Sequence, residues 1–281
     1  MIKIISDTLS SITPEEAKAL NIALLPQIIH FGDKTYRDDY EITPEEFLLK
    51  LKESKELPKT SAPWPELYRP IFEEALKTCD TILCLLPSEK ISGTFRGATL
   101  GTKYFPDADI RIFDTESVAP IQGTMTKLAK QWVDEGQDID IVLAKLDDLK
   151  NRQKSIFVVD TLEYLYKNGR IGGAKNLFGS ILEIKPILKL ENGAITALES
   201  QRTQKRAIIR MKELVVEQYP KVSSGHLTIT HAGVPHRAKK IASELKELLT
   251  LENEIPIYNL PPAIMVHVGP GAIAVQFFSE K

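Results

Sequence analysis

The sequence predicts an α/β protein of two domains: a parallel-sheet α/β domain over residues 1–153 and a mixed α+β domain over residues 154–281. Strands, loops and helices are expected to alternate through the first domain, which is typical of a parallel sheet covered on both faces. Within it, Thr81–Leu86 is an uninterrupted apolar run, as in buried parallel strands. In the second domain, residues 185–190 and 194–198 alternate in polarity around an Asn-Gly turn, which is typical of a β-hairpin.

Length, charge and cysteine content limit the class of protein. A chain of 281 residues is long enough for two domains that each bury a core. Its net charge of −2 gives no long-range attraction to nucleic acid, so we expect no nucleic-acid partner. The N-terminal residues carry charge too early for a signal peptide, and no apolar run is long enough to span a membrane. We therefore expect a soluble, cytoplasmic protein in which Cys79 and Cys84 are reduced core thiols.

Capping motifs and apolar runs predict the elements of the first domain. Thr13-Pro14-Glu15-Glu16 and Thr43-Pro44-Glu45-Glu46 are capping boxes with proline at the first helical position, so each predicts the start of a helix. The predicted strands are residues 2–5, 22–31, 81–86 and 110–113. The predicted helices are residues 14–20, 44–51, 65–76, 94–104, 122–133 and 139–149. Residues 58–63 are expected to form a loop because they are rich in proline and hydroxyl side chains.

The polar stretch Asn151-Arg152-Gln153-Lys154 lacks apolar periodicity and marks the predicted domain boundary. Beyond it the predicted strands are residues 156–159, 185–190, 194–198, 227–230 and 255–258. The predicted helices are residues 161–167, 204–218 and 236–249. The last segment, residues 264–278, is apolar apart from His267 and Gln276 and is broken by Gly269-Pro270-Gly271, so we expect His267 to lie in an apolar strand.

The sequence Ser92-Gly93-Thr94 is expected to connect the buried strand 81–86 to a helix. Unpaired N–H groups and the positive end of the helix dipole converge at a helix N-terminus, which makes it suitable for an anion. The small side chains leave room for a ligand, and the two hydroxyls can donate hydrogen bonds to it. We predict that this turn holds a carboxylate rather than a phosphate.

Other polar residues have a structural interpretation that competes with a functional one. Ser6-Asp7-Thr8 and Thr60-Ser61 contain hydroxyls of the kind that usually cap helices, although loops that share one sheet edge can also form a ligand site. His267 is as consistent with a hydrogen-bonded core residue as with a functional one. Taken alone, Arg170 and Arg202 are typical of solvated surface arginines. The sequence has no metal-ligand spacing, no P-loop and no nucleophile elbow, so we expect no metal and no cofactor.

A set of short motifs, in this order and at these spacings, resembles the DegV family of bacterial fatty-acid-binding proteins. The motifs are Ser6-Asp7-Thr8, Thr60-Ser61-Ala62-Pro63, Ile91-Ser92-Gly93-Thr94, Asp160-Thr161-Leu162-Glu163-Tyr164-Leu165 with Gly169-Arg170-Ile171, Lys185-Pro186-Ile187-Leu188 and His267-Val268-Gly269-Pro270-Gly271. Ala62 and Val268 stand where the family often has glutamine and threonine, and Ala119-Pro120-Ile121 replaces a more glycine-rich loop. The first two departures remove polar groups near the expected ligand head.

The resemblance implies a lipid carrier, not an enzyme, that binds one long-chain fatty acid in a cleft between two α/β domains. The implied carboxylate ligands are Thr60, Ser61, Ser92, Gly93, Thr94 and, from the second domain, His267. A fatty acid kinase would be the partner and would make the acyl-phosphate, with Arg170 and Arg202 as contacts for the phosphate or the kinase. Transient membrane contact is compatible with this role. Residues near Phe157, Phe178, Ile181 and Leu182 are candidates for the lining of the ligand tunnel.

Two alternatives stay open at this point. Ser92, with His267 as base and Asp7 or Asp114 as orienting acid, would give a Ser-dependent lipid hydrolase or acyltransferase. A binder of another small anion, such as a sugar phosphate, would also use a helix N-terminus.

Overall fold

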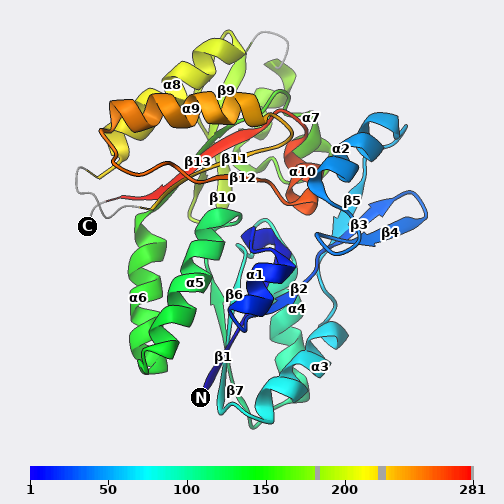
Figure 1. Ribbon diagram of the computed structural model, residues 1–281. Helices are drawn as coiled ribbons and strands as arrows, with labels where there is room; N and C mark the ends of the chain where they lie inside the picture. The colour runs from blue at the N-terminus through cyan, green and yellow to red at the C-terminus, as the bar shows by residue number, and fades with distance from the viewer. Residues whose placement is uncertain (181–183, 221–225, 280–281) are drawn as a thin grey trace. The chain divides into compact units, whose positions relative to one another are not determined.

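The computed structural model describes residues 1–180, 184–220 and 226–279, and the chain divides into two compact units (Figure 1). The first unit comprises Met1–Thr43 and Pro58–Asn151, and the second comprises Pro44–Leu57 and Arg152–Lys281. The sequence predicts a single boundary after residue 153. In the structure, the second unit begins at residue 152 and also includes residues 44–57. This segment contacts the rest of the second unit, since the Asn259 amide donates to the Glu45 carboxylate at 3.0 Å.

A four-stranded parallel sheet forms the centre of the first unit. Its strand order is β2 (Ala23–Leu25), β1 (Ile2–Asp7), β6 (Thr81–Leu86) and β7 (Asp109–Asp114). The helices of this unit are α1 (Pro14–Ala19), α3 (Pro65–Leu76), α4 (Thr94–Gly101), α5 (Pro120–Asp134) and α6 (Ile139–Arg152), with short 3₁₀ helices η1 (Thr8–Ser10) and η2 (Thr102–Tyr104).

Helices cover both faces of this sheet, as the apolar run of β6 requires. Figure 1 shows α5 and α6 on one side and α3 and α4 on the other. On the latter side, Tyr68 and Phe72 of α3 pack against Ile82 and Cys84 of β6 in one buried cluster. Because both faces of the strand are covered, consecutive residues can be apolar.

A second, three-stranded antiparallel sheet in the first unit corrects two predictions. Its strands are β4 (Lys34–Arg37), β3 (Ile28–Phe31) and β5 (Lys59–Ser61). The predicted strand over residues 22–31 is therefore wrong: β2 ends at Leu25, and β3 starts a different sheet after Pro26 and Gln27, because proline cannot donate to a strand ladder. The predicted loop over residues 58–63 contains β5.

The second unit is built on a mixed six-stranded sheet. Its strand order is β10 (Ala194–Gln201), β9 (Lys185–Glu191), β8 (Gln153–Val158), β13 (Ile273–Phe278), β11 (Leu227–His231) and β12 (Ile257–Asn259). The pairing is antiparallel except between β11 and β12. The helices are α2 (Pro44–Glu53), α7 (Glu163–Lys167), α8 (Gln204–Gln218), α9 (Pro235–Leu248) and α10 (Pro262–Val268), with the 3₁₀ helix η3 (Gly172–Ser180). The predicted fold class is thus confirmed.

One predicted strand of the second unit is a helix. The apolar residues before Gly269 form α10, which has Pro262 at its first turn, and the strand β13 begins only at Ile273. His267 consequently lies in the last turn of a helix and not in a strand. A short apolar run that is buried on all sides has no periodicity to distinguish the two structures.

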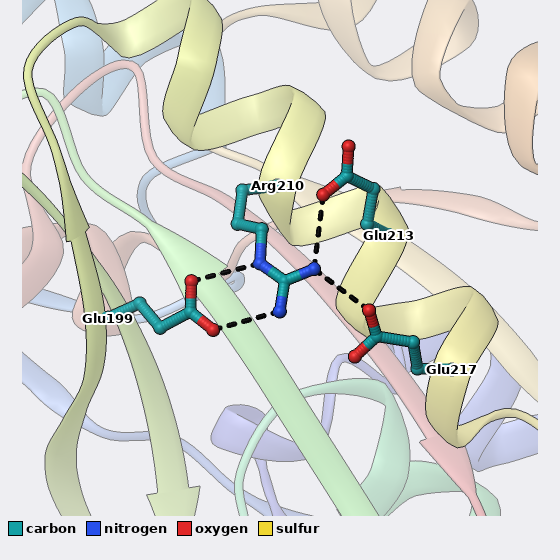
Figure 2. Close-up of polar contacts among 4 residues, drawn as sticks. All are labelled: Glu199, Arg210, Glu213 and Glu217. Carbon is teal, nitrogen blue, oxygen red and sulfur yellow. Dashed lines mark hydrogen bonds and ion pairs between the residues drawn. The ribbon is translucent and has the colours of Figure 1, made fainter.

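A charged cluster joins β10 to α8 in the second unit (Figure 2). The Arg210 guanidinium donates twice to the Glu199 carboxylate at 2.9 Å, and it also contacts Glu213 at 3.1 Å and Glu217 at 2.8 Å. Hydrogen bonding to Arg210 lowers the pKa of Glu199. Because the paired side chains remain partly exposed, we assign the cluster to the fixing of the helix on the hairpin and not to ligand binding.

Candidate functional site

The turn formed by Ser92, Gly93 and Thr94, called the 92–94 turn below, lies where the sequence places it. It follows β6 at the carboxyl end of the parallel sheet, and Gly93 is the N-cap of α4. The Ser92 and Thr94 hydroxyls are 2.8 Å apart, and the Thr94 N–H donates to Ser92 Oγ at 3.3 Å. Thr94 is buried, whereas Gly93 is exposed. The turn therefore presents a small, polar surface that is fixed by hydrogen bonds from within.

Residues 60–63 lie directly against the 92–94 turn and α4. A Cβ atom built on Gly93 would be 3.5 Å from the Ala62 Cβ, and one on Gly97 would be 2.5 Å from the Pro63 carbonyl oxygen. Glycine at position 97 thus permits a close approach of α4 to this segment. Thr60 pairs with Ile29 in the antiparallel sheet, and the Ser61 hydroxyl is 2.9 Å from His30 Nε2. The structure therefore brings together two predicted site segments that are about thirty residues apart in sequence.

Asp7, at the end of β1, forms the centre of a buried polar network beneath the 92–94 turn. Gln27 Nε2 donates to Asp7 Oδ2 at 2.6 Å, and Gln122 Nε2 donates to Asp7 Oδ1 at 2.8 Å. The same Gln27 nitrogen donates to Thr94 Oγ1 at 2.9 Å. A continuous chain of hydrogen bonds consequently runs from Asp7 through Gln27 and Thr94 to Ser92.

Burial changes the acidity of Asp7. The carboxyl group is fully buried, and this desolvation raises its pKa to about 7, although hydrogen bonds from Gln122, Gln27 and Thr94 act in the opposite direction. Asp7 is therefore an acid that changes charge near neutral pH directly behind the predicted carboxylate site.

The sequence prediction missed the two glutamines of this network. Gln27 lies in the Pro26–Gln27 break between β2 and β3, where its backbone N–H donates to Thr8 Oγ1 at 3.1 Å. Gln122 is buried in the first turn of α5. The available signal was a polar amide inside an otherwise apolar run, since such a residue must find a buried partner.

Ala119, at the N-cap of α5, adopts a backbone conformation that glycine prefers. Its φ of 62° and ψ of −152° lie in a region that is almost restricted to glycine, and the residue is 3% exposed. The Ala119 N–H donates to the Leu9 carbonyl at 2.7 Å, which holds the residue in place. The strain lies three residues before Gln122, at the point where α5 starts.

Ala119→Gly is expected to raise the free energy of unfolding by about 1 kcal/mol, because relief of about 1–3 kcal/mol of backbone strain exceeds the entropy that glycine adds to the unfolded chain. Urea denaturation of the variant and the parent measures this difference. Ala129→Gly, the same change at a regular buried position of α5, is the control and should lower stability by about 1 kcal/mol or more. A loss of stability in Ala119→Gly would contradict the strain argument.

In the second unit, His267 and Arg170 are neighbours. The Asn168 amide donates to the Val266 carbonyl at 2.9 Å, and Arg170 Nη1 donates to the Asn168 carbonyl at 2.8 Å, so α7 and α10 are linked at this point. Burial and, second, the positive charge of Arg170 lower the pKa of His267 to about 3. The imidazole is therefore neutral at physiological pH and offers one N–H donor.

The other motifs of the second unit lie around the loop that contains Gly269 and Gly271. A Cβ on Gly269 would lie 2.4 Å from the Tyr164 ring, and one on Gly271 would lie 2.0 Å from the Asp160 carboxylate. Lys185 Nζ donates to the Asp160 carbonyl at 2.9 Å. Arg202, in contrast, is exposed on the short connection between β10 and α8. Of the residues considered for a ligand tunnel, Ile181 and Leu182 lie outside the described residues.

The two acids considered for a catalytic triad bind amides. Asp7 accepts hydrogen bonds from the Gln27 and Gln122 side chains, and Asp114 accepts the backbone N–H groups of Glu116 at 2.8 Å and Glu89 at 3.4 Å. Over the ranges that the structure describes, no helix has the length and apolar character needed to cross a membrane, and no group of three or more His, Cys, Asp or Glu side chains is arranged to hold a metal ion.

Known proteins are similar to this chain over its whole length. It matches the DegV family, described as an uncharacterised protein family, over residues 1–280. A DegV domain-containing protein of Halalkalibacterium halodurans is 32% identical, with 100% of this chain and 99% of that protein covered. The solved structure of a fatty-acid-binding DegV family protein from Thermus thermophilus is 30% identical, with a TM-score of 0.87 and 99% of each chain covered. DegV of Bacillus subtilis, a fatty acid binding protein, is 28% identical, with the same TM-score and coverage.

Proposed function

The chain belongs to the DegV family, and we propose that it binds a long-chain fatty acid whose carboxylate rests on the 92–94 turn. The observation that supports this proposal is the packing of residues 60–63 against that turn, which brings the segment that carries Thr60 and Ser61 next to the segment that carries Ser92. The full-length similarity to DegV proteins that bind fatty acids supports the same ligand class.

The chemistry of this set suits a fatty acid. Each methylene moved out of water contributes about 0.8 kcal/mol, so the acyl chain supplies most of the affinity. The carboxylate is costly to bury unless it receives hydrogen bonds. Hydroxyls and the N–H groups at the start of α4 supply short, charge-assisted bonds of this kind.

His267 and Arg170 have complementary parts in the proposal. The family resemblance predicts that the neutral His267 imidazole donates one hydrogen bond to the carboxylate, and the positive charge of Arg170 lies beside this histidine in the second unit. The position of the ligand between the two domains is a prediction of the family resemblance, as are the contacts of Arg170 and Arg202 with a phosphate or a kinase.

We propose a carrier role, with any phosphorylation to an acyl-phosphate done by a separate fatty acid kinase in the cytoplasm. The acids that an acyl-transferring serine would need, Asp7 and Asp114, are engaged with amides. A carrier also needs no cofactor of its own. Passage of the ligand from a membrane would require only transient contact.

Ser92→Ala and Thr60→Ala are each expected to weaken fatty-acid binding about tenfold or more, because each removes a hydrogen bond to a charged group. Titration with the fluorescent fatty acid cis-parinaric acid measures the dissociation constant. Thr99→Ala is a matched control: its hydroxyl is exposed on α4, the helix that follows the 92–94 turn, and donates to the Phe95 carbonyl at 2.9 Å. Equal affinity in all three variants would remove the assigned head-group site, and absence of binding by the parent protein would remove the function.

A further inference from the structure

We propose that Asp7 is a positioning residue for the carboxylate site and that it takes up one proton when the fatty acid binds. This inference rests on the proposed function. Asp7 touches neither the turn's exposed surface nor the ligand in this account; it acts through Thr94 and Ser92, and Gln27 bonds to both Asp7 and Thr94. Binding would then be coupled to pH by a buried acid that does not itself contact the ligand.

The geometry leaves two consistent arrangements of hydrogens along this chain. Gln27 Nε2 has two hydrogens, which go to Asp7 at 2.6 Å and Thr94 at 2.9 Å. Thr94 Oγ1 therefore already accepts one bond and can accept one more while it donates its own hydrogen. Ser92 Oγ is 2.8 Å from Thr94 Oγ1, and a hydrogen bond from Thr94 lowers the pKa of Asp7, so Thr94 can donate either to Ser92 or to the ionised acid.

The charge of Asp7 selects between the two arrangements. When Asp7 is ionised, Thr94 donates to Asp7, and Ser92 must donate to Thr94. Ser92 then turns lone pairs toward an incoming carboxylate. When Asp7 carries a proton, it donates to Thr94, Thr94 donates to Ser92, and the Ser92 hydrogen points outward. Only the second arrangement offers the carboxylate a hydrogen bond from the Ser92 hydroxyl, and it also avoids two buried negative charges close together.

The side chains described here around Asp7 are neutral or acidic, so they do not stabilise its ionised form by positive charge. The Tyr68 hydroxyl donates to the Thr94 carbonyl at 3.3 Å, and burial raises the pKa of this phenol well above its usual range. Burial also raises the pKa of the Cys84 thiol on the adjacent strand, so both groups are neutral. Asp38, which accepts a hydrogen bond from Thr8 at 2.9 Å, is an acid and brings no positive charge. Gln122 and Thr126 of α5 are uncharged.

The coupling predicts the sign and size of a pH effect. A nearby ligand carboxylate raises the pKa of Asp7 above its value of about 7 in the free protein. Affinity should then be level below about pH 7 and fall by up to tenfold per pH unit above it, until the pKa of the complex is reached. His267 stays neutral in the free protein over this range, so it does not account for a loss of affinity at high pH.

The test is a series of cis-parinaric acid titrations from about pH 6 to about pH 9, together with calorimetry in two buffers of different ionisation enthalpy to count protons. The parent protein should lose affinity as stated and take up close to one proton per ligand near pH 8. Asp7→Asn, which cannot titrate, should bind with a dissociation constant independent of pH. Asp114→Asn is the matched control, because burial also raises the pKa of Asp114 at the end of the neighbouring strand, and it should retain the slope.

The outcomes separate this inference from the function on which it rests. Binding with a level pH profile and no proton uptake would overturn the role of Asp7 and leave the fatty-acid carrier intact. A slope that persists in Asp7→Asn would also overturn it. If Asp7→Asn does not fold, the proton count of the parent protein decides alone. Absence of binding at every pH would overturn both proposals.

Discussion

Gly123→Ala is expected to destabilise the first unit by about 2–4 kcal/mol, although alanine is the better helix former by about 1 kcal/mol. A Cβ atom at this position of α5 would lie 2.3 Å from the Ser10 carbonyl oxygen and 3.3 Å from Ile12 Cγ1. The helix would have to move by about 1 Å to restore contact distances. Gln122, the preceding residue, would then lose its 2.8 Å bond to Asp7, which leaves buried polar groups unpaired.

Urea denaturation followed by circular dichroism measures this change. Gly93→Ala is the matched control, since its Cβ would meet only the Ala62 Cβ, at an ordinary contact distance of 3.5 Å, and stability should change by less than about 1 kcal/mol. If Gly123→Ala were as stable as the parent or more stable, helix propensity would outweigh packing, and the close approach of α5 to η1 would be incorrect.

Asp7→Asn is expected to stabilise the folded protein by about 2–4 kcal/mol at pH 8 and to have little effect at pH 4. Folding raises the pKa of this carboxyl from 3.8 to about 7. The folded state therefore binds the proton more tightly, and the stability due to the protonated acid is complete below about pH 4 and is lost as the pH rises through about 7. Asparagine is uncharged at every pH, as the protonated acid is.

The difference in the free energy of unfolding between Asp7→Asn and the parent should be measured across this range. It should grow with pH and then become level. A variant that is less stable than the parent at pH 8 would mean that the glutamine amides favour the ionised acid, and the raised pKa would be refuted. The comparison at pH 4 is an internal control, because the side chain at position 7 is uncharged in both proteins there and the difference reports only on hydrogen bonding and shape.

Local sequence patterns predicted most of the elements, for physical reasons that can be named. The predicted helix over residues 204–218 coincides with α8, since Thr203 accepts a capping hydrogen bond from the Arg206 N–H at 3.2 Å. The β9–β10 hairpin forms around its Asn-Gly turn. The strand–turn–helix at Ser92 also forms as expected.

The failures occur where distant contacts decide the structure. Residues 22–31 read as one apolar strand, but Gln27 leaves the ladder to bind Asp7 and Thr94. The apolar residues before Gly269 become α10 because a buried segment lacks the periodicity that separates helix from strand.

The candidate site shows the same division. The motifs of the sequence contain its hydroxyl residues. The packing of residues 60–63 against the 92–94 turn and α4 depends on Gly97, and local sequence did not predict this contact. The buried glutamines were missed because a polar residue gives no indication of its partner. The raised pKa of Asp7 arises from burial, which is a property of the folded unit and not of the motif.

A crystal structure of the protein with palmitate tests the central claim most directly. We predict continuous density for the acyl chain, with a carboxylate oxygen within hydrogen-bond distance of Ser92 Oγ. Palmitate with its carboxylate bound elsewhere, or a protein that does not take up palmitate, would contradict the assignment.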